Sequence, residues 1–251
     1  MIRFDELTSA IESFAPLDEY LDIDSSGVQI RTGSGVLERI LVCLEVNDDV
    51  IDEAIEEGAD VIITHHPLIF YPVSSIESGD VPGRYIIRLL ENGISVYSSH
   101  LPFDFCETGN NAYLAKLLGL LDADTKSGRF PEPVSLEKAC DLVEKALDLP
   151  GGYIRVVDGG RESISKVGFC TGAGGDMIRD ALNDGCDLFI TGDLKLHEAQ
   201  YAKARGISVI DAGHYGTEKI FTENFAAQLS RKLGSGAIVI EAKADTNPYI
   251  L

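Results

Sequence analysis

The sequence predicts an α/β protein built from two similar halves, each a mostly parallel sheet with flanking helices. Two observations lead to this fold class. Short apolar runs alternate with segments of helical periodicity, and residues 39–66 recur as residues 166–193 without a gap. Strand–helix–strand units of this kind pair parallel strands and pack the helix on the sheet. The repeat therefore indicates an internal duplication.

The first copy reads RILVCLEVNDDVIDEAIEEGADVIITHH. It predicts a strand over 40–44, then a helix whose apolar residues follow helical spacing, then a buried strand over 59–64 that ends on two histidines. Gly58 stops the helix at a natural C-cap position.

The second copy, KVGFCTGAGGDMIRDALNDGCDLFITGD, predicts the same elements. Gly185 ends its helix, and CDLFIT forms its second strand. Eight identities support the alignment: Cys43, Asp49, Ile51, Ala54, Gly58, Asp60, Ile63 and Thr64 recur as Cys170, Asp176, Ile178, Ala181, Gly185, Asp187, Ile190 and Thr191.

The repeat continues into NGISVYSSHLPFD and RGISVIDAGHYGTE, each followed by a helix. We therefore expect a first half over 1–126 and a second half over 127–251, with a linker at Ser127–Pro133 in KSGRFPEP. The last strand, GAIVIEAK, either stays with the second half or returns to the first.

Composition excludes several classes of protein. A net charge of −20 and the lack of a Lys/Arg cluster argue against nucleic-acid binding. No apolar run approaches the roughly 18 residues of a membrane span, and MIRFDELTSAIESF is no signal peptide, so we expect a cytoplasmic protein. The five cysteines are scattered without metal-site spacing, as small buried apolar residues would be.

Four of the five histidines stand at the carboxyl ends of predicted strands, where open α/β sheets build their sites. His65 and His66 are adjacent, and side chains that diverge at a strand end suit two metal ions. In His100-x-x-x-Asp104 and His214-x-x-x-Glu218, the i, i+4 spacing on a helix start puts both side chains on one face. The candidate metal ligands from the sequence are therefore His65, His66, His100 and His214, with the carboxylates Asp104 and Glu218.

Imidazoles with carboxylates suit Zn, Fe, Mn, Co or Ni better than Ca or Mg. A single histidine at a strand end is more often structural, but the shared placement of four of them favours a metal site. His197, in TGDLKLHEAQYA, fits either a helix surface or the rim of a site. The glycine-rich stretch TGAGGDMIRDAL fits either a phosphate cradle or a tight turn between strand and helix.

The stretches ITHHPLIF, SSHLPFD, FITGDLKLHEA and DAGHYGTEK resemble the Nif-three-like dinuclear metal protein family, in its compact archaeal-type form. Many members are labelled GTP cyclohydrolase type 2 homologue. The resemblance implies two divalent ions per subunit in a cleft between the halves, with Glu218 bridging them. It also implies a toroidal homohexamer, with His100 as an additional group and His197 lining the cavity. The implied metal ligands are His65, His66, Asp104, His214 and Glu218.

One stretch departs from the family pattern. Members carry a Trp-containing segment rich in Asp and Asn before Gly-x-Gln, whereas this chain has LDIDSSGVQIRTG and no Trp. Gly27-Val28-Gln29 remains. The departure leaves the metal ligands intact and puts the role of this segment toward substrate in doubt.

Two functions from different classes fit these residues. The first is a hydrolase that acts on a purine nucleotide or a phosphoester through a metal-bound hydroxide, with His100 or His197 as general acid or base. The second is a non-catalytic scaffold or metal-handling protein assembled as a ring. An open coordination position beside a cavity of nucleotide size favours the first.

Overall fold

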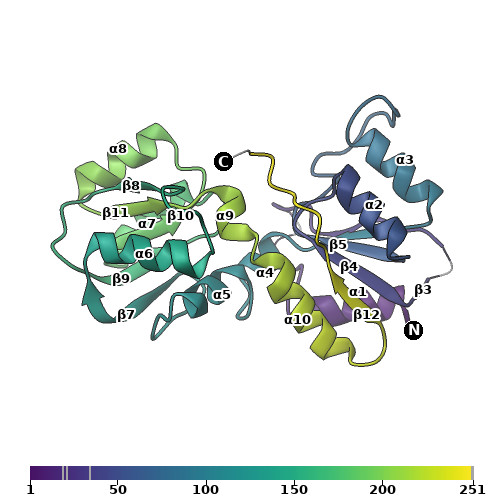
Figure 1. Ribbon diagram of the computed structural model, residues 1–251, viewed down its shortest axis with the longest axis horizontal. Coiled ribbons are helices and arrows are strands. Elements are labelled where there is room, and N and C mark those ends of the chain that lie inside the picture. The colour runs from purple at the N-terminus through teal and green to yellow at the C-terminus, as the bar shows by residue number, and fades with distance from the viewer. Residues whose placement is uncertain (19, 21, 34, 250–251) are drawn as a thin grey trace. The chain divides into compact units, whose positions relative to one another are not determined.

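The computed structural model describes residues 1–18, 20, 22–33 and 35–249. The chain divides into two compact units, the first made of 1–106 with 221–251 and the second of 107–220 (Figure 1). The sequence predicts halves over 1–126 and 127–251 and leaves open that the C-terminal segment packs back on the first half. By contacts between residues, the units divide at 106 and again at 220. The last segment of the chain therefore belongs to the first unit.

The first unit is built on a five-stranded sheet in the order β12-β4-β5-β6-β2. The first four strands in this order run parallel, and β2 is antiparallel to β6. The strands are β2 (Gly27–Ile30), β4 (Arg39–Cys43), β5 (Val61–Thr64), β6 (Ser95–Ser98) and β12 (Ile238–Glu241). A separate antiparallel pair joins β1 (Ile2–Arg3) to β3 (Val36–Leu37).

Helices cover both faces of this sheet. Helices α2 and α3 lie on one side, and α1 and α10 lie on the other (Figure 1). The helices are α1 (Phe4–Glu12), α2 (Asp48–Glu56), α3 (Gly83–Glu91), the short α4 (Leu101–Asp104) and α10 (Phe221–Leu233).

The second unit has a five-stranded sheet in the order β7-β9-β10-β11-β8. Strands β9, β10 and β11 are parallel, and the two edge strands are antiparallel to their neighbours. The strands are β7 (Ser127–Val134), β8 (Arg155–Val157), β9 (Ile164–Phe169), β10 (Leu188–Thr191) and β11 (Ser208–Asp211).

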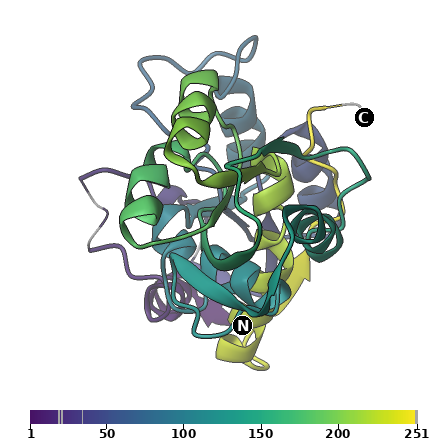
Figure 2. The same cartoon turned by 90° about the vertical axis from the view of Figure 1, so that its left-hand side faces the viewer.

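Helices α5 and α6 pack on one face of the second sheet, and α7 and α8 lie on the other (Figures 1 and 2). The helical elements are α5 (Asn110–Leu117), α6 (Leu136–Ala146), the 3₁₀ turn η1 (Gly175–Met177), α7 (Ile178–Asn183), α8 (Leu196–Arg205) and the short α9 (His214–Glu218). The predicted fold class, with mostly parallel sheets flanked by helices, is confirmed.

The unit β4-α2-β5 shows why this sequence folds as it does. Asn47 caps α2 by accepting a hydrogen bond from the backbone of Val50 at 2.8 Å. Gly58 follows the helix with φ +63°, a left-handed conformation in which glycine carries no Cβ penalty. All four residues of β5 are buried, as a continuous apolar run in a parallel sheet requires.

The two sheets share a central plan. The run β4-α2-β5-α3-β6 corresponds in strand order and direction to β9-α7-β10-α8-β11. The sheets differ at one edge, where β12 lies parallel to β4 but β7 lies antiparallel to β9. A duplication remains our interpretation of this correspondence.

Two connections of the chain differ in how far the sequence predicted them. The linker predicted at Ser127–Pro133 was wrong, because these residues form most of strand β7 against β9. The last strand returns to the first unit, where β12 pairs with β4.

The cysteines behave as apolar packing residues. Cys43, Cys170 and Cys186 are buried, and the other two are partly buried. Burial raises the pKa of the Cys43 thiol to about 12 and that of Cys186 to about 11, so both stay protonated at neutral pH. Among the described residues, no helix is long and apolar enough to cross a membrane.

Candidate metal centre

Three of the predicted histidines meet in the first unit. His65 and His66 directly follow β5, and His100 follows β6, so two neighbouring parallel strands deliver them to the same sheet edge. The ring centroid of His65 lies 5.1 Å from that of His66 and 5.0 Å from that of His100. One ring nitrogen from each histidine lies within 4.8 Å of the others. These three side chains, the histidine cluster, could hold a metal ion.

Oxygen atoms fix the orientation of two of these rings. The backbone oxygen of Ser99 lies 3.0 Å from His65 Nδ1, and Asp24 Oδ1 lies 2.7 Å from His100 Nδ1. Because a carbonyl or carboxylate oxygen only accepts, both Nδ1 atoms carry the proton. An imidazole held in this way presents Nε2 as a metal ligand, the arrangement usual around protein-bound metals.

A buried carboxylate accompanies the cluster. Asp104, the last residue of α4, is 4% exposed, and its Oδ1 lies 3.6 Å from His65 Nε2. His65 is fully buried, and its ring packs on that of Phe221 with centroids 4.7 Å apart. The side chains of His66 and His100 are 24% and 18% exposed. The cluster is therefore closed on the Asp104 side and reaches solvent at His66 and His100.

Asp24 is a site residue that the sequence analysis missed. Its side chain is 1% exposed, and Ser26 Oγ both donates to the Asp24 carboxylate and accepts from the His100 backbone N–H at 2.9 Å. Burial raises the pKa of Asp24, but the hydrogen bonds from His100 and Ser26 outweigh it and hold the pKa below its ordinary value. Asp24 thus stays ionised and anchors His100.

The stretch that departs from the family pattern therefore has a structural role, apart from Leu21, which lies outside the described residues. Ser25 Oγ donates to the Phe70 backbone oxygen at 2.8 Å. Gln29 donates to the Ser25 backbone oxygen at 2.7 Å and accepts from the Ile69 N–H at 2.9 Å. These bonds join the segment before β2 to the loop that follows His66.

The second unit carries the other two predicted ligands. His214 and Glu218 form the two ends of α9, and His214 Nε2 lies 2.9 Å from Glu218 Oε2. Asp193 Oδ2 lies 2.8 Å from His214 Nδ1, so the imidazole is oriented as His100 is by Asp24. Asp193 adopts φ +51°, an uncommon conformation for a residue other than glycine. Glu218 is 2% exposed.

Glycines allow the ends of β9 and β10 to approach α9. A Cβ on Gly172 would overlap Glu218 Oε1 and lie 3.3 Å from His214 Nε2. A Cβ on Gly192 would lie 2.5 Å from the His214 backbone nitrogen. Only glycine at these two positions leaves room for His214 and Glu218 as they stand.

The glycine-rich stretch around Gly172 is a tight turn. The Gly172 N–H donates to Thr217 Oγ1 at 2.9 Å, and the Gly174 N–H donates to Thr191 Oγ1 at 2.8 Å. The carboxylate of Glu198 occupies the space beside Gly175 that a Cβ would need. Two backbone N–H groups of the stretch are thus bonded to the chain's own side chains, which favours the turn interpretation. The phosphate cradle stays a prediction.

His197 lies on α8, where its side chain is 77% exposed and its Nε2 stands 4.0 Å from Glu198 Oε1. It borders a hollow of about 530 Å³ together with Arg179 and Tyr201. Within the part of the chain that the structure describes, it belongs to none of the groups that could hold a metal. Its role as a catalytic or cavity-lining residue stays a prediction.

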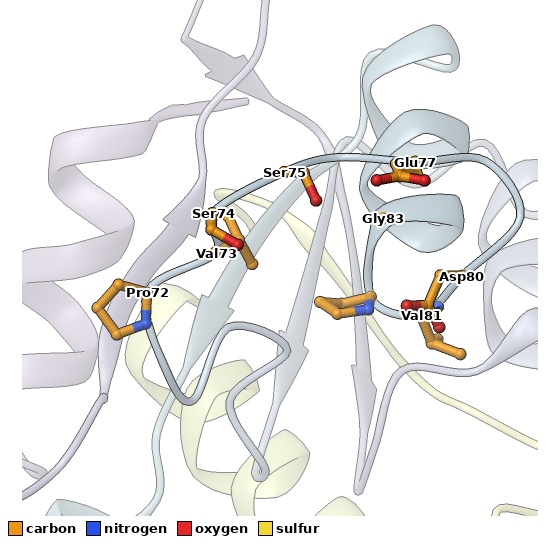
Figure 3. A pocket seen from close by; sticks show the side chains of 9 residues that line it. Pro72, Val73, Ser74, Ser75, Glu77, Asp80, Val81 and Gly83 are labelled. Atoms are coloured by element: carbon orange, nitrogen blue, oxygen red, sulfur yellow. Dashed lines mark hydrogen bonds between the residues drawn. The ribbon is translucent and has the colours of Figure 1, made fainter.

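A second hollow lies in the connection between β5 and α3. Figure 3 shows its lining, which includes Ser74, Ser75, Glu77 and Asp80, and its volume is about 230 Å³. The loop folds tightly, since a Cβ on Gly83 would lie 2.5 Å from the Glu77 backbone oxygen. None of the residues lining this hollow belongs to the histidine cluster.

Comparison with known proteins places the chain in a family. The family model described as Duf34/NIF3 (NGG1p interacting factor 3) matches residues 2–248. The chain belongs to this family. The expected resemblance to Nif-three-like proteins is thereby confirmed.

Curated relatives and solved structures agree with this assignment. The chain is 32% identical to the GTP cyclohydrolase 1 type 2 homolog of Streptococcus pneumoniae, covering 97% of each chain. The crystal structure of a Bacillus cereus protein related to NIF3 matches the fold with a TM-score of 0.91 at 22% identity, covering 100% of this chain and 99% of that one. Reduced HcgD from Methanocaldococcus jannaschii matches with a TM-score of 0.80 at 27% identity, covering 97% and 98%.

Proposed function

We propose that this Duf34/NIF3 protein binds two divalent metal ions and uses them to hydrolyse a small phosphorylated molecule. The ions would be Zn, Fe, Mn, Co or Ni, and the substrate a purine nucleotide or another phosphoester. The ligands would be His65, His66, Asp104, His214 and Glu218, so both units would contribute to one centre. A toroidal homohexamer in the cytoplasm is part of the proposal, and light scattering of the purified protein tests the hexamer.

The histidine cluster carries this proposal. Its rings converge within 4.8 Å through one nitrogen each, while opposing oxygens hold Nδ1 of His65 and His100. Orienting several imidazoles toward one point serves no purpose in hydrophobic packing, but it is what a metal of this class requires.

The carboxylates fit the same group of metals. Asp104 and Glu218 are 4% and 2% exposed. A buried carboxylate is stable only when it is hydrogen-bonded, paired with a cation or bound to a metal. A donor set of neutral imidazoles and ionised carboxylates supplies the charge and ligand type that a divalent transition ion prefers over Ca or Mg.

The roles of the chain's own residues follow from these positions. When bound, the two ions would acidify a water molecule and stabilise developing negative charge on the substrate. His66 and His100 mark the solvent side of the cluster, so substrate would enter there. Asp24 would keep the proton of His100 on Nδ1. His100 would then hold Nε2 toward the substrate or the metal, as ligand or proton acceptor.

The relatives' names favour the nucleotide. The Streptococcus pneumoniae protein is called a GTP cyclohydrolase 1 type 2 homolog. We extend that name to this chain only as a guide to substrates. GTP, GMP and simple phosphoesters belong in one panel, because ring opening and phosphate release give different products.

The test begins with metal content. We expect His66→Ala to lower the metal bound per chain, measured by plasma mass spectrometry after dialysis, while His197→Ala matches the unmodified protein. Circular dichroism checks that both variants fold. Equal metal content in the His66 variant would refute the ligand assignment.

Turnover is tested separately on metal-loaded protein with the same panel of substrates. We expect product formation that disappears in His66→Ala. Firm metal binding with no product from any substrate would refute the hydrolase and support a metal-handling scaffold.

A further inference from the structure

Two aromatic side chains stand exposed beside the histidine cluster. Phe70 is 45% exposed and Tyr71 is 77% exposed. Their rings meet edge to face, with centroids 4.9 Å apart at an interplanar angle of 77°. The Phe70 ring also lies edge to face with His100, with centroids 6.4 Å apart. The aromatic pair therefore begins where the cluster reaches solvent.

Hydrogen bonds hold the backbone at Phe70, the first member of this pair. The Phe70 backbone oxygen accepts from Ser25 Oγ at 2.8 Å, and the preceding Ile69 N–H donates to Gln29 Oε1 at 2.9 Å. Pro72 follows directly and fixes its own φ. A surface that is already ordered loses little conformational freedom when a ligand binds.

The same short segment positions both features. Asp24 and Ser26 hold His100, while Ser25 and Gln29 hold Phe70 and Ile69. The spacing between an imidazole and an aromatic ring is thereby fixed through one stretch of chain. Such coupling is expected where one ligand must contact both groups.

Exposed aromatic rings at the edge of a polar site suit a flat ring in the ligand. Any of the nucleobases can stack on Phe or Tyr, because every base has a π face. Charge favours this means of binding here. In a chain with a net charge of −20, phosphates are repelled except where cations hold them, whereas stacking requires no charge.

We propose that Phe70 and Tyr71 form a stacking surface for the base of the substrate. The substrate is then a nucleoside phosphate and not a simple phosphoester. This inference rests on the proposed function, which places the reacting group of the substrate at the metal centre. The stacking itself needs no metal, so it can be measured whether or not the hydrolase proposal holds.

The experiment uses the absence of tryptophan from the chain. Tyr71→Trp introduces a single indole at the proposed surface, and Tyr249→Trp introduces one at a control position of similar exposure, 70%. Metal-free protein is titrated with guanosine, which has a base and no phosphate, and with ribose 5-phosphate, which has a phosphate and no base.

We expect guanosine to quench Tyr71→Trp fluorescence with saturation and to leave Tyr249→Trp at the level of free tryptophan. Ribose 5-phosphate should quench neither. Adding Phe70→Ala to Tyr71→Trp should weaken guanosine binding about tenfold, the effect of losing one stacking ring.

Three results would overturn the proposal. One is equal quenching by guanosine of the two tryptophan variants. Another is saturable quenching by ribose 5-phosphate. The third is a fluorescence change of Tyr71→Trp that follows protein concentration and not guanosine, which would assign the aromatic pair to contact between copies of the chain. Failure of turnover alone would leave the stacking result standing.

Discussion

Replacing Gly172 by alanine tests how the second unit holds Glu218. Gly172 has φ +67°, so any L side chain costs about 1–2 kcal/mol there. Gly185 has φ +75° and open space around its absent Cβ, so Gly185→Ala carries the backbone cost without a clash. The difference between the two variants therefore isolates what the new methyl group does to Glu218.

The clash at Gly172 is large on the scale of metal coordination. Glu218 Oε1 must retreat by about 1.3 Å to reach ordinary contact at 3.4 Å from the new Cβ. Ligand distances to a metal tolerate only about 0.2 Å. If the buried carboxylate cannot move freely, overpacking adds about 1–3 kcal/mol to the destabilisation.

We expect Gly172→Ala to lose about 2–5 kcal/mol of unfolding free energy in urea, and Gly185→Ala about 1–2 kcal/mol. Metal content should fall in the first variant and stay at the level of the unmodified protein in the second. Equal stability and equal metal content in the two variants would refute the view that Gly172 exists to seat Glu218.

Four further outcomes follow from the site and the core. Asp24→Ala should lower metal affinity by about 10–100-fold. Asp24→Asn should be intermediate, because its amide oxygen still accepts from His100. Equal metal affinities of the two variants and the unmodified protein, measured by competition with a chelator, would contradict this. Metal should be released as pH falls below about 6.5, since protonated imidazole cannot bind it. Full retention at about pH 5 without excess metal would show that carboxylates, and not histidines, are the main ligands. In the metal-free protein, the Asp24 pKa lies below its ordinary value of about 3.9, so the stabilisation that Asp24 provides is complete above that pH and is lost as pH falls through the lower folded-state pKa. Asp24→Asn should flatten this acid limb in urea unfolding, and an unchanged limb would count against the hydrogen bonds of the ionised Asp24. At pH 8, Cys43 and Cys186 should react with a thiol reagent only after unfolding, because their pKa values of about 12 and 11 leave almost no thiolate; fast labelling of the folded protein would contradict their burial.

The strands and histidines were predictable because their signals are local. A buried run such as Val61–Thr64 reads as a parallel strand from its composition alone. Parallel neighbours end at one sheet edge, so the sequence could bring His65, His66 and His100 together. For these residues, the amino acids next to them in the chain are enough to predict the strand and its end.

Other parts depend on partners far away in sequence. Asp24 looks like any loop aspartate until its partner His100, 76 positions later, is known. The stretch Ser127–Val134 contains two prolines and looks like a linker, yet β9 pairs with it along a sheet edge, where proline is tolerated. Local propensity cannot anticipate such pairings.

The return of the chain to the first unit has a consequence for biosynthesis. Strand β12 completes the first sheet beside β4, and the Ile238 N–H donates to the Glu38 backbone oxygen at 2.7 Å. During translation the first sheet can therefore be completed only after β12 has been made, while the second unit, which is continuous, can fold sooner. A ribosome-bound chain should thus become protease-resistant in its middle before its beginning, and early protection of the N-terminal segment would contradict that order. Any centre that needs residues from both units would be the last thing the nascent chain acquires.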